Sequence, residues 1–507
     1  MKTEPKIPIP EFFKGRNVLI TGASGFMGKI LVEKLLRCCP EIGKIYIILR
    51  SRGDKSPKER WDEMTKLPVF DRLKTEYPKH LEKIVVMEGD VAEKDLGLAV
   101  HHQIMLEEDV SVVFHSAASV RFDDPLSKAV FLNTRGALES IKLAGRMRNL
   151  KCYLYVSTAY SNSHLDVPEI EEKVYPAKYD YNMLIKLLES HAKPEEIEVL
   201  AKKIIDKHPN TYTFSKSLAE QVMADYSTKI PIVIVRPSVV INSIHEPFTG
   251  WLENLNGPMG IIAGVTKGIL RVFLVNENCS LDYVAVDYAI NSLIVSAWHK
   301  AIAEEREKKQ LTIYNCVYGN VRTATFGDII NAGPSVAYDN PYTDVLWYPS
   351  IVTTTNTTLF TFLFYILQII PSLFLDAVLW LFSYKPMFLK ISRKIYIASF
   401  ALQTFSTKII KFSNRCYQSL WTAVSESDSK IFFMNPPEDI TVSDIILLCH
   451  LGMRKYYFHE SESNLPQARV KFNRLYWADR TLRIFVMGIF TWFSSKYFMN
   501  TLSKFVS

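Results

Sequence analysis

Short apolar runs alternate with helix-like segments along the first half of the chain. The run 17–21 has the length and composition of a buried strand, and the apolar positions of 28–38 recur at helical spacing. The same pattern predicts further strands at 44–49, 83–87, 110–115, 151–157 and 232–236. Because strands separated by helices pair in parallel, this half of the chain is predicted to form a doubly wound α/β domain.

Two later segments depart from this alternation. Segment 163–209 is charged and helix-prone, which predicts an insertion or a lid rather than part of the sheet. Segment 238–334 is richer in Gly and Asn, and such a segment usually builds a substrate region over the carboxyl edge of the sheet. The expected first domain therefore covers 1–334.

The hydrophobic pattern changes near residue 335. A turn-rich linker at 335–357 leads into an apolar stretch, 359–375, which lacks charge over about 17 residues and is close to the length that crosses a bilayer. We expect a mainly helical C-terminal domain over 358–460, with apolar membrane-associated segments. A tail over 461–507 contains a second apolar patch at 484–493.

The first apolar stretch does not match a simple membrane crossing. Pro371 would kink a helix, Asp376 is costly in hydrocarbon, and a buried helix is an alternative interpretation. A basic cluster follows, formed by Lys385, Lys390, Arg393 and Lys394. Basic residues favour the cytosolic side, where the catalytic domain is also expected, so the pattern favours a hairpin or an interfacial helix kinked near Pro371. The patch 484–493 is a tail anchor only if it extends through 497–498, and otherwise an interfacial segment.

Composition narrows the class of protein. A chain of 507 residues suggests two or three domains, and 48% hydrophobic residues with 22% charged residues indicate a globular protein. The net charge of +7 suits phosphorylated ligands or anionic headgroups, but a solvated surface explains it equally well. No Lys/Arg run is dense enough to predict nucleic-acid binding.

Cysteine usage and the N-terminus bear on the compartment. The count of seven cysteines is odd, and their spacing contains no C-x-x-C pair, which predicts buried reduced thiols rather than disulfides or a metal site. No apolar signal-peptide core precedes the first strand. We therefore expect a catalytic domain that faces the cytosol, at a membrane of the endoplasmic reticulum or the peroxisome.

A glycine-rich turn, VLITGASGFMG, joins the first strand to the first helix. Gly22 permits the sharp turn, Gly25 lets the backbone approach a pyrophosphate, and Gly28 lets the helix pack closely on the strand. The helix N-terminus then supplies free N–H groups to the phosphates. A plain structural turn is the alternative, but the strand–turn–helix context favours a Rossmann-type dinucleotide site.

The end of the second strand bears on the choice of cofactor. An NAD site usually has Asp or Glu there, whereas this chain has Arg50 and Arg52, which suit the 2′-phosphate of NADPH. Solvated loop arginines are the alternative. Asp90 follows the third strand, where it is placed to meet the adenine, and small residues follow His115 where the backbone would pass under the cofactor.

Three residues form the predicted catalytic group. Tyr212 and Lys216 are four residues apart, so both side chains lie on one face of a helix. A phenol is a poor acid–base group near neutral pH until a cation stabilises its phenolate, a role that Lys216 could fill while holding the nicotinamide ribose. Ser157, at a strand end, would hydrogen-bond the carbonyl oxygen while Tyr212 donates the proton.

These segments together resemble the fatty acyl-CoA reductases, an alcohol-forming branch of the extended short-chain dehydrogenases. The resemblance covers most of the chain and rests on TGASGFMGK, HSAASVRFDD, YVSTAY, TYTFSK, IVRPSVV, GWLENLNGPMG and LDYVAVDYAIN. Two departures are small: the family often has Thr where this chain has Ser215, and Pro where it has Ala285.

The resemblance implies an activity and a set of partners. It implies that a long-chain acyl-CoA is reduced to a fatty alcohol, a lipid precursor, through an aldehyde, with two NADPH consumed and coenzyme A released. Membrane lipid is the other expected partner. One rival is an extended dehydrogenase for a sterol or nucleotide sugar, which would not explain GWLENLNGPMG; the other is an inactive NADP-binding scaffold, which would typically have lost Tyr212 or Lys216.

Overall fold

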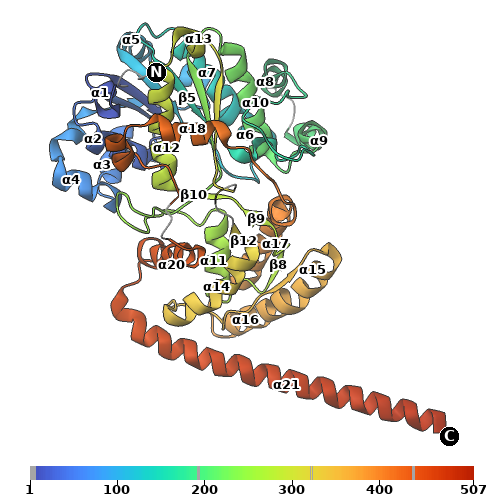
Figure 1. Ribbon diagram of the computed structural model, residues 1–507. Helices are drawn as coiled ribbons and strands as arrows, with labels where there is room; N and C mark the ends of the chain where they lie inside the picture. Colours follow the sequence, from blue (N-terminus) through green and yellow to red (C-terminus); the bar gives the residue numbers. More distant parts are fainter. Residues whose placement is uncertain (1–6, 191–193, 320, 322–323, 437–439, 507) are drawn as a thin grey trace. The chain divides into compact units, whose positions relative to one another are not determined.

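The computed structural model describes residues 7–190, 194–319, 321, 324–436 and 440–506. The chain forms two compact units, each discontinuous in sequence (Figure 1). Unit 1 contains 1–254, 278–325 and 400–441, and unit 2 contains 255–277, 326–399 and 442–507. The contiguous boundaries expected at 334, 357 and 460 remain predictions about sequence modules, whereas the compact units interleave along the chain.

A seven-stranded parallel sheet forms the centre of unit 1. Its order is β11-β6-β5-β4-β1-β2-β3, and the order reverses between β1 and β4, where such sheets bind their ligands. The strands are β1 Asn17–Thr21, β2 Ile45–Leu49, β3 Ile84–Glu88, β4 Val110–His115, β5 Cys152–Val156, β6 Ile232–Pro237 and β11 Thr312–Cys316. The predicted doubly wound α/β fold is confirmed, with β11 as an additional edge strand.

Helices cover both faces of this sheet. The helices α7 (Gly136–Ala144) and α10 (Thr211–Tyr226) share one hydrophobic cluster with strand residues such as Leu19 and Val113. The strand neighbours of these residues are also buried and point to the opposite face. There α2 (Phe26–Cys38) packs against α12 (Val286–Ile302). Burial on both faces explains why the strands are almost continuously apolar.

Shorter elements complete unit 1. The segment expected as an insertion carries two helices, α8 and α9. Two further two-stranded sheets pair β7 with β10 and β9 with β12. The remaining bounds are α1 Ile9–Phe13, α3 Pro57–Met64, α4 Asp71–Glu76, α5 Val100–Asp109, α6 Leu126–Val130, β7 Val239–Ile241, α8 Tyr181–Glu189, α9 Pro194–Ile205, β9 Ser280–Leu281, β10 Tyr283–Ala285, α13 Glu305–Lys308, β12 Ala324–Thr325, α18 Arg415–Ala423 and α19 Glu426–Ile431.

Unit 2 is mainly helical, as expected for the C-terminal region. Its elements are α11 Pro258–Thr266, β8 Val272–Leu274, α14 Phe326–Asp339, β13 Val352–Thr354, α15 Thr357–Phe364, α16 Ile370–Leu381, α20 Val442–Gly452 and α21 Leu465–Val506. Helix α17, Phe388–Thr407, begins in unit 2 and ends in unit 1. Helix α14 continues past Pro334 to Asp339, so the start of the expected linker is helical rather than turn-like.

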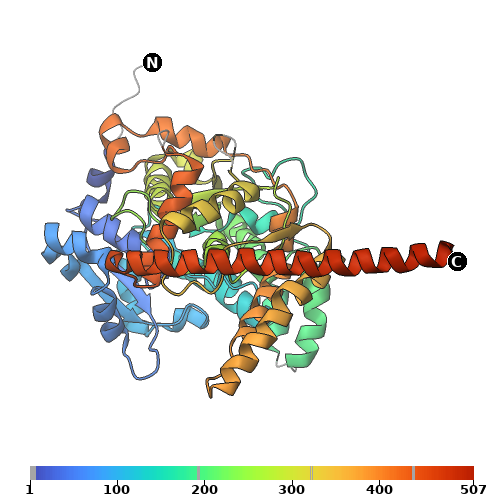
Figure 2. The ribbon, with the colours of Figure 1, turned by 90° about the horizontal axis from the view of Figure 1, so that it is seen from below.

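Apolar side chains are exposed on two helical stretches of unit 2. Among the described residues, one helical stretch, Thr357–Leu381, is long and apolar enough to cross a membrane, and only 22% of its apolar window is buried. The second stretch is α21, a 42-residue helix that Figure 2 shows without interruption. Its side chains from Ile484 to Phe493, the second apolar patch, are exposed.

Candidate active site

The turn between β1 and α2 has the geometry of a phosphate cradle. Gly22 has φ +77°, and a Cβ there would lie 2.6 Å from the backbone nitrogen of Ala117. A Cβ on Gly28 would collide with the Gly22 carbonyl, so the helix can approach the strand only with glycine. Gly25 is the N-cap of α2, and no side chain of the described protein caps that helix. The free N–H groups and the positive end of the helix dipole therefore fit the pyrophosphate of a dinucleotide.

The ends of β1 and β4 are fastened together at this cradle. The Thr21 hydroxyl lies 3.0 Å from Nδ1 of His115, and the Ser116 hydroxyl donates to the Thr21 carbonyl at 2.8 Å. Burial, helped by the Lys216 ammonium, lowers the pKa of His115 to about 3, so its ring is neutral. These contacts join the carboxyl ends of β1 and β4 where the sheet order reverses.

Three arginines gather beyond the end of β2. Arg50 is largely exposed, and its Nη1 lies 3.2 Å from Asp90, whose other oxygen accepts the Ala92 N–H. Arg60, on α3, donates to the Arg50 carbonyl at 2.5 Å. Burial and the charges of Arg50 and Arg52 lower the pKa of Arg60, as expected where cations outnumber their counter-ions. Arg60 could not be predicted from the sequence as part of this group, because only the fold brings it beside Arg50.

Helix α10 presents Tyr212 on its first turn. The Asn210 side chain caps the helix by accepting the Thr213 N–H at 2.9 Å, and the Thr211 hydroxyl donates to the Asp124 carbonyl at 2.9 Å. Buried Asn133, in the helical segment Phe131–Arg135, donates to Ser215 Oγ at 2.9 Å. It also bonds the backbone of Ser119, so it ties the loop after β4 to the same turn. The position of Tyr212 is therefore determined by several long-range hydrogen bonds.

The hydroxyl side chain next to the Tyr212 phenol is that of Thr158. Burial raises the pKa of Tyr212 to about 12, and the hydrogen bond with Thr158 opposes that rise. The predicted partner, Ser157, instead donates its hydroxyl to Glu220 Oε1 at 2.6 Å. Ser157 thus stays a prediction for the catalytic hydroxyl, and the geometry favours its neighbour Thr158, which the sequence analysis passed over.

Lys216 is buried one helical turn after Tyr212. Its Nζ donates to the Val156 carbonyl at 2.7 Å and lies 4.8 Å from the centre of the Tyr155 ring. Burial lowers the pKa of Lys216 to about 7, although the Glu220 carboxylate raises it. Among the described contacts, none joins this ammonium directly to the Tyr212 hydroxyl. A buried lysine poised near neutral pH is nevertheless typical of a functional site.

A buried ion pair lies behind Ser157. Glu220 and Arg236 are almost completely buried, and two hydrogen bonds of 2.8 and 2.6 Å join them. Arg236 also donates to the carbonyls of Glu171 and Lys173, and Ser161 donates to Glu220. The pair therefore joins β5, β6 and α10 beneath the catalytic side chains.

A row of aromatic rings begins at Tyr212 and continues through Phe122, Phe405 and Tyr160. The Phe122 ring centre lies 6.0 Å from that of Tyr212, and Phe405 lies 5.7 Å from Phe122. Tyr160 meets Phe405 at 5.3 Å, edge to face. All four side chains belong to unit 1. This aromatic cluster makes the surroundings of the phenol apolar.

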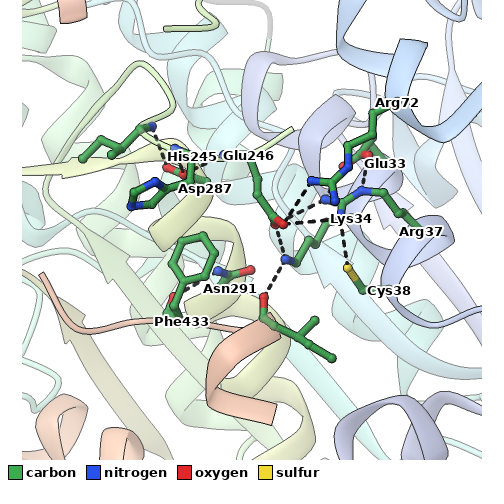
Figure 3. Close-up of polar contacts among 12 residues, drawn as sticks. Glu33, Lys34, Arg37, Cys38, Arg72, His245, Glu246, Asp287, Asn291 and Phe433 are labelled. Carbon is green, nitrogen blue, oxygen red and sulfur yellow. Dashed lines mark hydrogen bonds and ion pairs between the residues drawn. The ribbon is translucent and has the colours of Figure 1, made fainter. Parts of the chain in front are cut away.

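A second ion cluster fastens the loop after β7 to the cofactor helix α2 (Figure 3). Glu246 accepts hydrogen bonds from Lys34, Arg37 and Arg72. Burial raises the pKa of Glu246, but the cations of Lys34 and Arg37 outweigh it and lower that pKa to about 2. Asp287, on α12, accepts the Glu246 backbone N–H at 3.0 Å. The loop is thereby held beside the helix whose N-terminus forms the cradle.

Solved structures with a similar fold include reductase domains. The terminal R domain of the myxalamid PKS-NRPS biosynthetic pathway matches with TM-score 0.59 and 17% identity, covering 89% of this chain and 92% of that one. The reductase domain of a nonribosomal peptide synthetase from Mycobacterium tuberculosis matches with TM-score 0.55 and 16% identity, covering 89% and 93%. At these identities the likeness shows the fold alone.

Sequence comparisons give a closer relationship. Two family models described as male sterility protein match residues 20–293 and 367–460. Fatty acyl-CoA reductase 1 of Xenopus laevis is 34% identical over 92% of this chain and 90% of its own length. Fatty acyl-CoA reductase 1 of Homo sapiens is 33% identical with the same coverage. These matches confirm the resemblance predicted from the motifs, and the chain belongs to the fatty acyl-CoA reductase family.

Proposed function

We propose that this protein reduces a long-chain fatty acyl-CoA to the fatty alcohol, using two NADPH and releasing coenzyme A through an aldehyde intermediate. The single observation that carries the proposal is the grouping of Tyr212, Thr158 and buried Lys216 where β5 ends. This grouping suits a nicotinamide whose pyrophosphate lies on the glycine cradle, because both stand at the carboxyl ends of the parallel strands. The family membership supplies the substrate class.

The reaction balances as two reductions. Bound NADPH supplies a hydride in each of them. In the first, the thioester carbon gains hydride, the C–S bond breaks, and coenzyme A leaves as a thiol after taking up one proton. In the second, the aldehyde carbon gains hydride and Tyr212 donates its proton to the oxygen.

Each residue of the site has a part in this chemistry. With substrate bound, the Thr158 hydroxyl turns its single proton to the developing oxyanion. The Lys216 ammonium stabilises the phenolate left after proton donation and holds the nicotinamide ribose. The aromatic cluster formed by Phe122, Tyr160 and Phe405 excludes water and offers an apolar surface to the first carbons of the acyl chain.

We expect Thr158→Val to lower kcat by about 10²–10³-fold, because it removes a hydrogen-bond donor aimed at the reacting oxygen. The matched variant Ser157→Ala removes a donor to buried Glu220 and should instead lower the free energy of unfolding by about 1–3 kcal/mol. Steady-state kinetics and denaturant unfolding of both variants separate the two roles. A large kcat loss in Ser157→Ala with unchanged stability would restore Ser157 as the catalytic hydroxyl.

The choice of NADPH over NADH rests on Arg50, Arg52 and Arg60. We expect Arg50→Ala and Arg52→Ala each to raise the KM for NADPH by about 10–100-fold, since each removes a charged hydrogen bond to the 2′-phosphate. The KM for NADH, which lacks that phosphate, should stay nearly constant. Arg148→Ala, at an exposed arginine outside this group, is the control. Equal losses for the two cofactors would show that the arginines do not recognise the 2′-phosphate.

Attachment to a membrane is part of the proposed function. Long acyl chains partition into bilayers, so an enzyme held at the surface receives its substrate directly. The exposed apolar stretches of α15–α16 and α21 support this attachment. We propose that unit 1 faces the cytosol at a membrane of the endoplasmic reticulum or the peroxisome. Recovery of intact protein in the soluble fraction after alkaline carbonate washing would exclude integral insertion.

Product identification tests the activity directly. The full-length protein is incubated with NADPH and a panel of acyl-CoAs, sterol ketones and nucleotide sugars, and the products are identified by mass spectrometry. Fatty alcohol formed only from the acyl-CoAs is the expected result. Reduction of a sterol or a sugar nucleotide, or no oxidation of NADPH with any substrate, would overturn the proposal.

A further inference from the structure

An antiparallel helical hairpin forms one part of unit 2. Its first arm, α15–α16, is one helix from Thr357 to Leu381 that widens to a π-turn at Tyr365–Ile369, just before Pro371. Its second arm is the start of α17, and Ser372 Oγ lies 2.8 Å from Ser392 Oγ across the seam. Figure 1 shows α15, α16 and α17 as neighbouring helices. At the base, Phe360 and Phe364 pack on β8.

The distribution of polar residues in this hairpin is the reverse of that in a water-soluble helix. The buried face of α15–α16 carries Gln368, Ser372 and Asp376 beyond its two phenylalanines. Its exposed face is apolar, with Phe362, Ile370, Leu373, Phe374, Trp380 and Leu381 each 50–72% exposed. In water this arrangement exposes the apolar side and buries the polar side. Only an apolar solvent outside the hairpin makes it favourable.

The polar groups on the inner face of the hairpin find hydrogen-bond partners within the protein, as Asp376 shows. Its two carboxylate oxygens accept the backbone N–H groups of Met387, Phe388 and Leu389 at 2.8–2.9 Å. These are donors at the start of α17 that have no partner within the helix. In the sequence, Asp376 counted against a membrane segment. In the structure its carboxylate points into the hairpin and both of its oxygens accept hydrogen bonds.

The tip of the hairpin combines apolar and basic side chains. Phe382, Tyr384 and Met387 are 51–67% exposed in the connection between α16 and α17. Lys385 is exposed in the same connection, and Lys390, Arg393 and Lys394 are exposed on the first two turns of α17. Within the described part of the chain, none of these four cations forms an ion pair with a carboxylate. Cations beside an exposed aromatic tip match the charge of anionic lipid headgroups.

We propose that this hairpin enters one leaflet of a bilayer containing anionic lipid, and that it does not cross the membrane. The first turns of α15 are held on β8, so the free arm is essentially α16, of 12 residues. At about 1.5 Å per residue this arm is about 18 Å long, whereas the hydrocarbon core is about 30 Å thick. The inference concerns attachment alone and does not depend on the proposed reaction.

Site-directed spin labelling of the full-length protein tests the depth. A nitroxide is attached at Phe374→Cys or Phe382→Cys in a Cys416→Ser background, which removes the exposed native thiol. With vesicles containing about 30% anionic phospholipid, both labels should lose collisions with a water-soluble nickel chelate and gain collisions with oxygen. Tyr338→Cys, an equally exposed site on α14 of the same unit, should remain in water.

Two outcomes of this measurement would overturn the proposal. One is an unchanged aqueous collision profile at both hairpin positions. The other is frequent collision of the 382 label with nickel chelate trapped inside the vesicles, which would place the tip on the far side of the bilayer. Because the readout is local to the hairpin, attachment through α21 cannot produce the expected signal.

A charge variant tests the headgroup. In this variant glutamine replaces Lys385, Lys390, Arg393 and Lys394. The equilibrium constant for insertion of the 382 label in anionic vesicles should fall by on the order of 10²-fold or more, because each cation contributes about fivefold. The effect should vanish in zwitterionic vesicles. The matched control replaces four exposed lysines of unit 1 by glutamine: Lys66, Lys79, Lys151 and Lys309. Equal loss in both variants would overturn the assignment of these four cations as the anionic-lipid contact.

Discussion

Tyr212→Phe is expected to lower kcat for acyl-CoA reduction by about 10²–10⁴-fold, because it removes the proton that the phenol gives to the substrate oxygen. The ring itself, with its contact to Phe122, is retained. NADPH binding, which depends on the glycine cradle and the arginines, should be nearly unchanged. Steady-state kinetics and fluorescence titration with NADPH measure the two effects separately.

Tyr181→Phe is the control for this substitution. Tyr181 is a buried tyrosine on α8 whose hydroxyl donates to Asp225 at 2.8 Å, on the far half of α10. Its loss should leave kcat close to that of the wild type. If Tyr212→Phe were as active as Tyr181→Phe, the phenol would not be the proton donor.

Glu220→Ala is expected to lower the free energy of unfolding by about 3–5 kcal/mol, because it leaves the Arg236 guanidinium buried without a counter-charge. Ser157 and Ser161 lose their acceptor in the same substitution. The double variant Glu220→Met/Arg236→Met removes both charges and should recover most of the loss. Denaturant unfolding followed by intrinsic fluorescence measures the three proteins.

The comparison of single and double variants is what tests the ion pair. A double variant less stable than Glu220→Ala would show that the backbone hydrogen bonds of Arg236 to Glu171 and Lys173 dominate. In that case the contacts of Arg236 with the loop at 171–173 would contribute more to the free energy of unfolding than the charge of Glu220 does.

The Rossmann half of the fold could be predicted from the sequence because its signals are local. Buried parallel strands are continuous apolar runs, and the strands at 17–21 and 110–115 have the bounds expected for them. The edge strand β11 was missed because TIYNC mixes polar residues into a short run. The interleaving of the two units could not be predicted, since it depends on which segments pack together after long excursions of the chain.

The candidate site also combines features that the sequence predicts with features that only the fold determines. The glycines and the Tyr212–Lys216 spacing are local patterns, and the fold brings them to one edge of the sheet. The contacts that decide between Ser157 and Thr158 are not local: Glu220 reaches Ser157 across 63 residues. Side-chain direction at a strand end depends on such partners, so adjacent hydroxyls could not be distinguished from the sequence.

For the apolar helical hairpin, the sequence predicted the type of segment but not its internal contacts. Pro371 and Asp376 argued against a simple span and favoured a hairpin or an interfacial helix. The structure has a helical hairpin at this place, and its insertion in a membrane stays a proposal. The use of Asp376 at the start of α17 was not predictable, because it depends on the neighbouring arm.

The central claim is that one site delivers two hydrides to the same carbon of a fatty acyl thioester. It is tested most directly with NADPH deuterated at both positions of its nicotinamide C4, long-chain acyl-CoA and the full-length protein. The account predicts a fatty alcohol with two deuterium atoms on C1 and two NADP⁺ per alcohol. With Tyr212→Phe this product should form at least about 10²-fold more slowly. An end product that is the singly deuterated aldehyde, or an alcohol without deuterium at C1, would contradict it.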